Sequence, residues 1–123
     1  KLFLPASSIG LLSVAVLNLN NMRDIENDTI AGKNTLVVKM GLNWAKKYQE
    51  ACIAMASILF IVFCIVVKVS AIPVLIINIP LLLHIGKIKK SEKYEDFDPE
   101  LKKVALSTFA LSILFWLTLI LNI

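Results

Sequence analysis

The chain has 123 residues, of which 58% are hydrophobic and 18% charged, and its formal net charge is +4. Soluble domains usually carry about 45–50% apolar and about 25% charged residues, so this composition argues against a soluble globular domain. The basic residues flank apolar blocks and do not form a basic face with interleaved aromatic side chains. This placement argues against a nucleic-acid-binding protein and is typical of the loops of a membrane protein.

The first apolar block covers residues 2–19 and follows a single lysine, Lys1. A secretory signal peptide has a shorter apolar core of about 7–15 residues and a small-residue cleavage site. This block is longer, and it runs directly into the polar sequence Asn20-Asn21-Met22-Arg23-Asp24. It therefore predicts a membrane-spanning helix, for which about 20 mostly apolar residues are needed.

The second and third apolar blocks, residues 51–67 and 69–85, are separated only by Lys68. One helix through both blocks would be far longer than the bilayer is thick. Ser70 is a residue type that caps helix starts, and Pro73 is tolerated in a first turn but not in a helix interior. The sequence therefore predicts two spans joined by a tight turn near residues 68–70.

The fourth apolar block covers residues 104–123, and Asp98-Pro99 predicts the start of its helix. Most basic residues fall in two segments, 20–50 and 86–103, while the opposite side carries only Lys1 and Lys68. By the positive-inside rule both segments should be cytoplasmic loops. We expect residues 1–123 to form part of a single all-α, multi-pass transmembrane helix bundle.

The segment of residues 20–36 carries the chemistry-bearing side chains. If the first helix continues past its apolar block, Asn20, Asp24 and Asp28 fall four residues apart on one face. Oxygen ligands favour a hard cation such as Mg²⁺, which keeps positions free for phosphate oxygens. Arg23 and Lys33 could bind the same phosphates. The alternative on spacing alone is a solvated loop of mixed charge.

Residues 20–36 show the pattern N-N-x-R-D-x-x-x-D-x-x-x-G-K-x-T-L. This pattern resembles the second aspartate-rich motif of the UbiA superfamily of intramembrane prenyltransferases, and within it the branch that prenylates 1,4-dihydroxy-2-naphthoate. The flanking residues 4–12 and 38–41 are similar in style. The resemblance implies a fold of about nine helices, of which this chain would supply about the last four.

The resemblance also implies roles for individual residues. Asn20, Asp24 and Asp28 would bind Mg²⁺, with Asn20 in place of the aspartate common in other members. Arg23 and Lys33 would bind the diphosphate, with Asn21 as a further contact. Asp24, Asp28 and Arg23 are the expected catalytic residues.

The implied reaction transfers a polyprenyl chain from polyprenyl diphosphate to 1,4-dihydroxy-2-naphthoate, with loss of carbon dioxide, to give demethylmenaquinone. The implied location is a bacterial inner (plasma) membrane. The first aspartate-rich motif is not in this chain, so we expect it to be a fragment that is inactive without the N-terminal half. Three alternatives are a related enzyme with another aromatic acceptor, a fragment of a transporter, and a small complete membrane adaptor.

Three other polar features have structural interpretations. His84 lies near the cytoplasmic end of the third span and is more often structural than a proton acceptor at such a place. Asn78, within the same span, is expected to bond a neighbouring helix. The acidic residues of segment 92–98 lack a common face and are balanced by lysines, which predicts a solvated loop.

Overall fold

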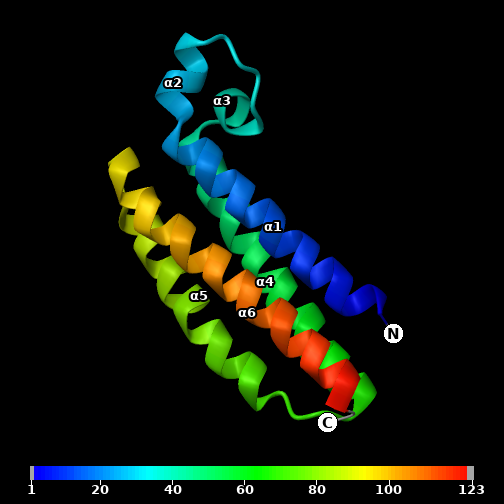
Figure 1. The fold of residues 1–123 in the computed structure, drawn as a ribbon. Helices are drawn as coiled ribbons and strands as arrows, with labels where there is room; N and C mark the ends of the chain where they lie inside the picture. Colours follow the sequence, from blue (N-terminus) through cyan, green and yellow to red (C-terminus); the bar gives the residue numbers. More distant parts are fainter. Residues whose placement is uncertain (1, 122–123) are drawn as a thin grey trace.

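The computed structural model describes residues 2–121, and this part of the chain is helical with no strand. Four long helices, α1 (Phe3–Arg23), α4 (Leu42–Val67), α5 (Ile72–Lys90) and α6 (Phe97–Leu121), form the bundle. Two short helices, α2 (Ile25–Ile30) and α3 (Leu36–Met40), and a 3₁₀ turn, η1 (Tyr94–Asp96), lie in the connections. The predicted all-α class is confirmed (Figure 1).

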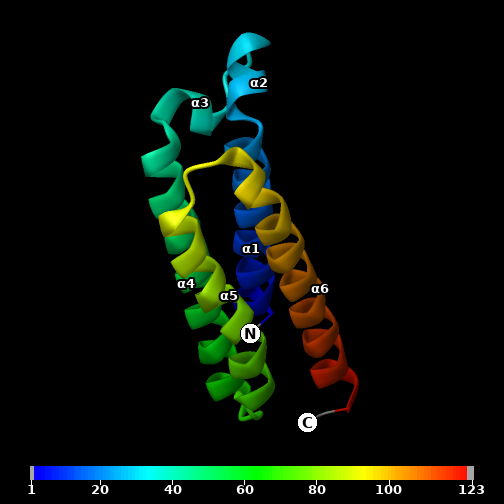
Figure 2. The same ribbon diagram turned by 90° about the vertical axis from the view of Figure 1, so that its left-hand side faces the viewer.

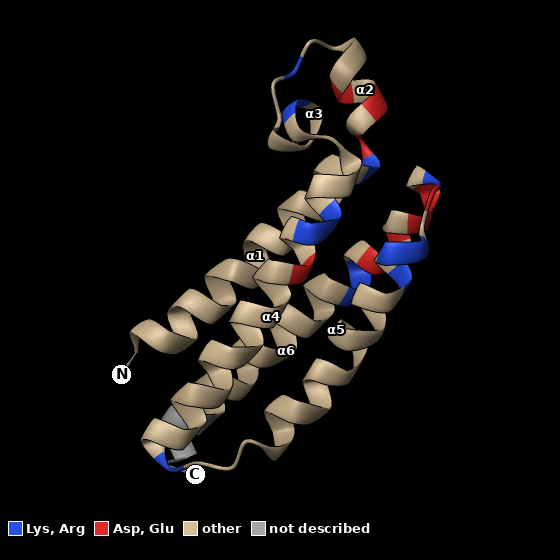
Figure 3. Cartoon of the chain, turned by 180° about the vertical axis from the view of Figure 1, so that it is seen from behind, with Lys and Arg blue, Asp and Glu red and all other residues tan. Residues whose placement is uncertain are grey.

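The four long helices run alternately up and down, with α1 packed on α4 and α6, and α5 packed on α6 and α4 (Figures 1 and 2). The short helices α2 and α3 extend beyond the bundle at the end where α1 finishes and α4 begins (Figure 2). Nearly all charged residues gather at this same end (Figure 3). We call it the charged end. Segments 20–50 and 86–103 therefore lie on one side of the bundle, as the sequence predicts.

Three helices in the described part of the chain, α1, α4 and α5, are long and apolar enough to cross a membrane. The fourth expected span, 104–123, coincides with α6 as far as residue 121, and its last two residues lie outside the described range. The helix α6 begins at Phe97, one residue before the predicted Asp98-Pro99 start. The helices α1 and α4 extend beyond their apolar blocks, so their polar residues lie at the charged end.

The turn between α4 and α5 is the predicted tight hairpin. Lys68 adopts the left-handed conformation (φ 63°), and the N–H of Val69 donates to the Cys64 carbonyl at 3.0 Å, which ends α4. The hydroxyl of Ser70 accepts a hydrogen bond from the N–H of Ile72 at 3.4 Å. Pro73 lies in the first turn of α5. The hairpin places the charged ends of α4 and α5 beside each other.

Small residues are among the buried positions of α1 and α4. Ala15, Ala45 and Ala56 are buried, and the hydroxyl of Ser8 donates to the Ala56 carbonyl at 2.7 Å. Small side chains let helix backbones approach closely, which is the usual way of packing helices within a bilayer. This close contact fixes the helix that leads into the motif.

Candidate functional site

The motif segment begins where α1 ends at Arg23 and α2 starts at Ile25. The N–H of Asp24 donates to the Asn20 carbonyl at 3.0 Å, and the N–H of Asp28 donates to the Asp24 carbonyl at 2.8 Å. The four-residue hydrogen-bonding step of an α-helix thus continues across the junction. Asn20, Asp24 and Asp28 keep the spacing that the sequence predicts, although the helix is divided in two at Asp24.

Arg23 joins the polar side chains at the end of α1. Its Nε and Nη2 donate to the two carboxylate oxygens of Asp24 at 2.7 and 2.9 Å, and Nη2 also donates to Asn20 Oδ1 at 2.8 Å. Its Nη1 donates to Oδ1 of Asp98, in the first turn of α6, at 3.0 Å. The guanidinium hydrogen bonds hold the pKa of Asp24 below its usual range, so this carboxyl stays ionised.

Asp28 has a different partner from Asp24. Its side chain is only 7% exposed and accepts a hydrogen bond from Lys33 Nζ at 2.7 Å. Gly32, with φ 67°, lets the chain turn back after α2, so that Lys33 comes close to Asp28. The backbone N–H of Lys33 donates to the Asp28 carbonyl at 2.9 Å. The Asp28 carboxylate raises the pKa of Lys33. Asp28 and Lys33 therefore form a second charged pair beside the Arg23–Asp24 pair.

The oxygens around Arg23 are of the types that a hard cation accepts. Oxygens of Asn20 and Asp24 already converge on one positive group, the Arg23 guanidinium, and amide and carboxylate oxygens are ligands that Mg²⁺ accepts. Asp28 is directed to Lys33, and residues 2–121 contain no group of three or more Asp, Glu, His and Cys side chains arranged to hold a metal. The metal roles of Asn20, Asp24 and Asp28, and the diphosphate role of Asn21, stay predictions.

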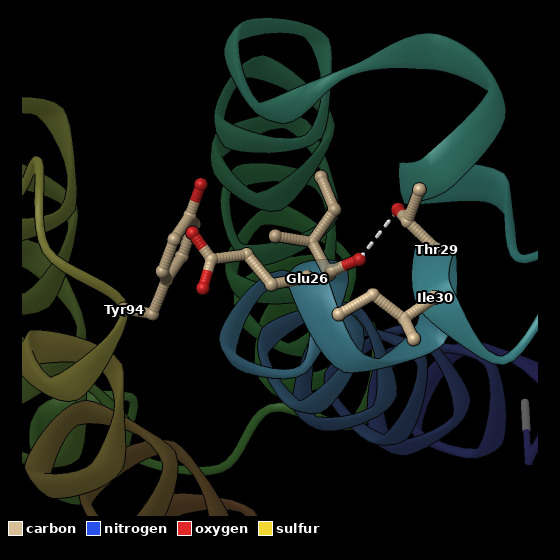
Figure 4. A pocket seen from close by; sticks show the side chains of 5 residues that line it. Glu26, Thr29, Ile30 and Tyr94 are labelled. Atoms are coloured by element: carbon tan, nitrogen blue, oxygen red, sulfur yellow. Dashed lines mark hydrogen bonds between the residues drawn. The ribbon is translucent and has the colours of Figure 1, made fainter.

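A pocket of about 390 Å³ lies at the α2 part of the motif segment, between α2 and η1, and Figure 4 shows its lining. It is lined by Ile25, Glu26, Thr29, Ile30 and Tyr94. Glu26 and Tyr94 approach each other across it, while Thr29 uses its hydroxyl to bond the Ile25 carbonyl at 2.7 Å (Figure 4). Asp24 and Asp28 do not line this pocket, so the two charged pairs lie outside it.

Sequence reasoning missed a chain of buried polar side chains below the charged end. Asn18 Nδ2 lies 2.9 Å from Gln49 Oε1, Gln49 Nε2 lies 3.2 Å from His84 Nε2, and His84 Nδ1 lies 2.8 Å from Glu100 Oε2. These four residues are at most 5% exposed. Helical spacing could have predicted that Glu100 is buried, because it falls on the same face of α6 as the buried residues Phe97, Val104, Ser107 and Leu111.

The other polar predictions concern Asn78, His84 and segment 92–98. Asn78 accepts a hydrogen bond from the hydroxyl of Ser57 on α4, which confirms its predicted link between helices. His84 is fully buried and bonded on both ring nitrogens, as a structural histidine would be. The acidic side chains of segment 92–98 are exposed or partly exposed, as predicted. Asp98, which is 59% exposed, also pairs with Arg23, because the start of α6 lies beside the end of α1.

The chain is 34% identical, over 98% of its length, to a Haemophilus influenzae protein named 1,4-dihydroxy-2-naphthoate octaprenyltransferase. By sequence, the chain resembles part of the 1,4-dihydroxy-2-naphthoate octaprenyltransferases. The octaprenyltransferase of Escherichia coli is 54% identical over 46% of the chain, and that of Mycobacterium leprae is 31% identical over 83% of it.

These matches confirm the resemblance that the motif segment suggests. The chain spans about two fifths of the Haemophilus influenzae octaprenyltransferase and smaller shares of the other two, 18% and 34%. No family model and no solved structure matches the chain.

Proposed function

We propose that this chain is part of a prenyltransferase that transfers a polyprenyl chain from its diphosphate to 1,4-dihydroxy-2-naphthoate. Loss of carbon dioxide during the transfer would give demethylmenaquinone. The observation that carries the proposal is the similarity of nearly the whole chain to an octaprenyltransferase named for that acceptor. The arrangement of Asn20, Arg23 and Asp24 at the charged end of an apolar bundle supports it.

Charge balance supports a requirement for Mg²⁺. Asp24, Asp28 and Asp98 carry three negative charges, whereas their partners Arg23 and Lys33 carry two positive ones. A cluster with a net charge of −1 repels a multiply charged diphosphate unless cations are added. Mg²⁺, when bound to Asn20, Asp24 and Asp28, would supply this charge and stabilise the leaving diphosphate.

The chain's own side chains would then bind and orient the diphosphate. The two-pronged donor of the Arg23 guanidinium is bonded to Asp24 in the structure, and it would turn to phosphate oxygens once Mg²⁺ takes the Asp24 carboxylate. Lys33 would offer a point charge. Both would stabilise negative charge that develops on the diphosphate as the bond to the prenyl carbon breaks. Lys33 is 64% exposed, so it has room to turn from Asp28 towards a phosphate.

An apolar groove of about 370 Å³ between α1 and α6 offers room for part of the prenyl chain. It is lined by Ile9, Ser13, Val16, Ala105, Thr108, Phe109 and Ser112. Its three hydroxyl groups donate to carbonyls one turn earlier in their own helices, at 2.8–2.9 Å. The groove therefore presents a largely apolar surface, which would hold an isoprenoid and keep water from the reactive carbon.

We place the motif segment on the cytoplasmic side of a bacterial plasma membrane. The support is the clustering of basic residues at the charged end, together with the bacterial sources of the three relatives.

The test uses the full coding sequence expressed in membranes. Labelled polyprenyl diphosphate is incubated with 1,4-dihydroxy-2-naphthoate or, as a control acceptor, a hydroxybenzoate, with Mg²⁺ or with a chelator. The proposal predicts a prenylated product with the naphthoate alone, and only with Mg²⁺. Transfer to the hydroxybenzoate would move the assignment to a related enzyme, and transfer to neither acceptor would refute prenyl transfer.

A further inference from the structure

The buried chain Asn18–Gln49–His84–Glu100, which we call the polar relay, has one possible direction of hydrogen bonding. Asn18 Nδ2 also lies 3.0 Å from the Ala45 carbonyl oxygen, which can only accept, so this atom is the amide nitrogen. Its other hydrogen-bond partner on Gln49 must then be the carbonyl oxygen. The NH₂ group of Gln49 consequently faces His84 Nε2 and donates to it.

The direction of these hydrogen bonds determines the protonation state of the imidazole. Because Nε2 of His84 accepts from Gln49, it carries no proton, and the ring is neutral. Its one proton is on Nδ1 and is donated to Oε2 of Glu100 at 2.8 Å. The charged groups near the ring are Glu100 and Lys103 from α6 and Lys87 from α5.

Glu100 ends the polar relay as an ionised acceptor. Its side chain is 1% exposed, and it accepts hydrogen bonds from Lys103 Nζ at 2.8 and 3.0 Å. Lys87 Nζ lies 3.3 Å from the same carboxylate. Both lysines are partly exposed, at 33% and 50%, and connect Glu100 to the charged end. Every buried side-chain nitrogen and oxygen in the described residues has a hydrogen-bond partner.

Each member of the polar relay comes from a different long helix: Asn18 from α1, Gln49 from α4, His84 from α5 and Glu100 from α6. Rotation or sliding of any one helix would leave a buried donor or acceptor unpaired. Asn18 lies less than two turns before Arg23 on α1, and that helix leads directly into Asp24. The relay therefore fixes the direction in which α1 presents the motif side chains.

We propose that the polar relay is a positioning network for the diphosphate site, with His84 held neutral and protonated on Nδ1. Its residues act through α1 and do not touch the substrate. The inference about the site rests on the proposed prenyltransferase function, whereas the protonation state of His84 does not.

The first test is independent of activity. His84 is the only histidine in this sequence, and the variant His84→Gln assigns its signals in the ¹⁵N NMR spectrum of the histidine-labelled, full-length protein. We expect a protonated Nδ1 and an unprotonated Nε2 that do not change between about pH 6 and 8, where free imidazole titrates. In Gln49→Glu, a carboxylate faces Nε2, so both nitrogens should be protonated. A proton on Nε2 in the unaltered protein would overturn the assigned direction of the relay.

The second test separates positioning from mere stability. Gln49→Leu should raise the KM for polyprenyl diphosphate about tenfold or more, with a smaller change in kcat. Asn78→Leu is the matched control, because it removes a buried amide of α5 that bonds Ser57 and not the relay. It should leave that KM unchanged even if the protein melts at a lower temperature.

The outcomes of the two tests are distinct. An equal KM in Gln49→Leu and the unaltered protein, with the NMR result as expected, would overturn the positioning role and leave a purely structural relay. Failure of the unaltered protein to transfer any prenyl group would refute the proposed function, and with it the positioning role. The NMR experiment would still test the protonation state of His84, which does not depend on the proposed function.

Discussion

Replacement of Arg23 by lysine tests whether the geometry of the guanidinium matters or only its charge. Arg23 makes four hydrogen bonds, two to the oxygens of Asp24 and one each to Asn20 and Asp98. A lysine ammonium keeps the charge but cannot make the paired contacts of the planar fork. Arg23 is about one-third exposed, so solvent screens these bonds, and we expect a loss of stability of only about 1 kcal/mol.

The effect on the diphosphate should be larger than the effect on folding. Loss of one two-pronged contact corresponds to about 1.4 kcal/mol, or a tenfold rise in the KM for polyprenyl diphosphate. The assay is prenyl transfer in membranes that contain the full-length protein, with the melting temperature measured in detergent. The control is the opposite exchange, Lys90→Arg, at an exposed position of α5, which should leave this KM unchanged. A KM for Arg23→Lys equal to that of the unaltered protein would refute a diphosphate role for the guanidinium.

Three further substitutions test an ion pair at the charged end and the backbone at two glycines. Asp98→Asn removes the ion pair between Arg23 and Asp98, whose side chains are 31% and 59% exposed. The melting temperature should change little, and the loss of folding free energy should be below about 1 kcal/mol. A much larger loss would show that this link between α1 and α6 is essential to the fold. Gly41→Ala should destabilise the protein by about 1–3 kcal/mol, because Gly41 has φ 84° and ψ 163°, a conformation that favours glycine. Gly86→Ala is the control: Gly86 lies within α5 and has space for a methyl group, so stability should stay equal or rise by about 1 kcal/mol. Chemical denaturation of the purified protein measures both glycine variants, and equal effects would contradict the backbone argument.

Much of the fold could be predicted because apolar blocks and their flanking charges respond to the bilayer alone. The hairpin at Lys68 and the common side of segments 20–50 and 86–103 follow from length, capping and the distribution of lysines. The break between α1 and α2 at Asp24 was not predictable in this way. At this break Arg23 bonds Asp98, which comes 75 residues later in the chain, and sequence spacing does not predict such a contact.

The site was predictable by residue type but not by pairing. The motif names Asn20, Asp24 and Asp28 as one set, yet Asp28 bonds Lys33 because Gly32 turns the chain back towards it. Glu100 was overlooked because it stands among other charged residues at the start of a helix. Only its helical register with the buried face of α6 distinguishes it from the solvated acids nearby.

The most direct test of the central claim replaces Asp28 with asparagine in the full-length protein and measures Mg²⁺-dependent prenyl transfer to 1,4-dihydroxy-2-naphthoate. The matched control is Glu26→Gln, which removes a negative charge from an exposed side chain in the same short helix. If Asp28 is a metal ligand, its replacement should lower the rate about 100-fold or more, and higher Mg²⁺ should restore part of it. A rate and a Mg²⁺ dependence equal to those of Glu26→Gln and the unaltered protein would contradict the claim that this segment is half of a magnesium-diphosphate site.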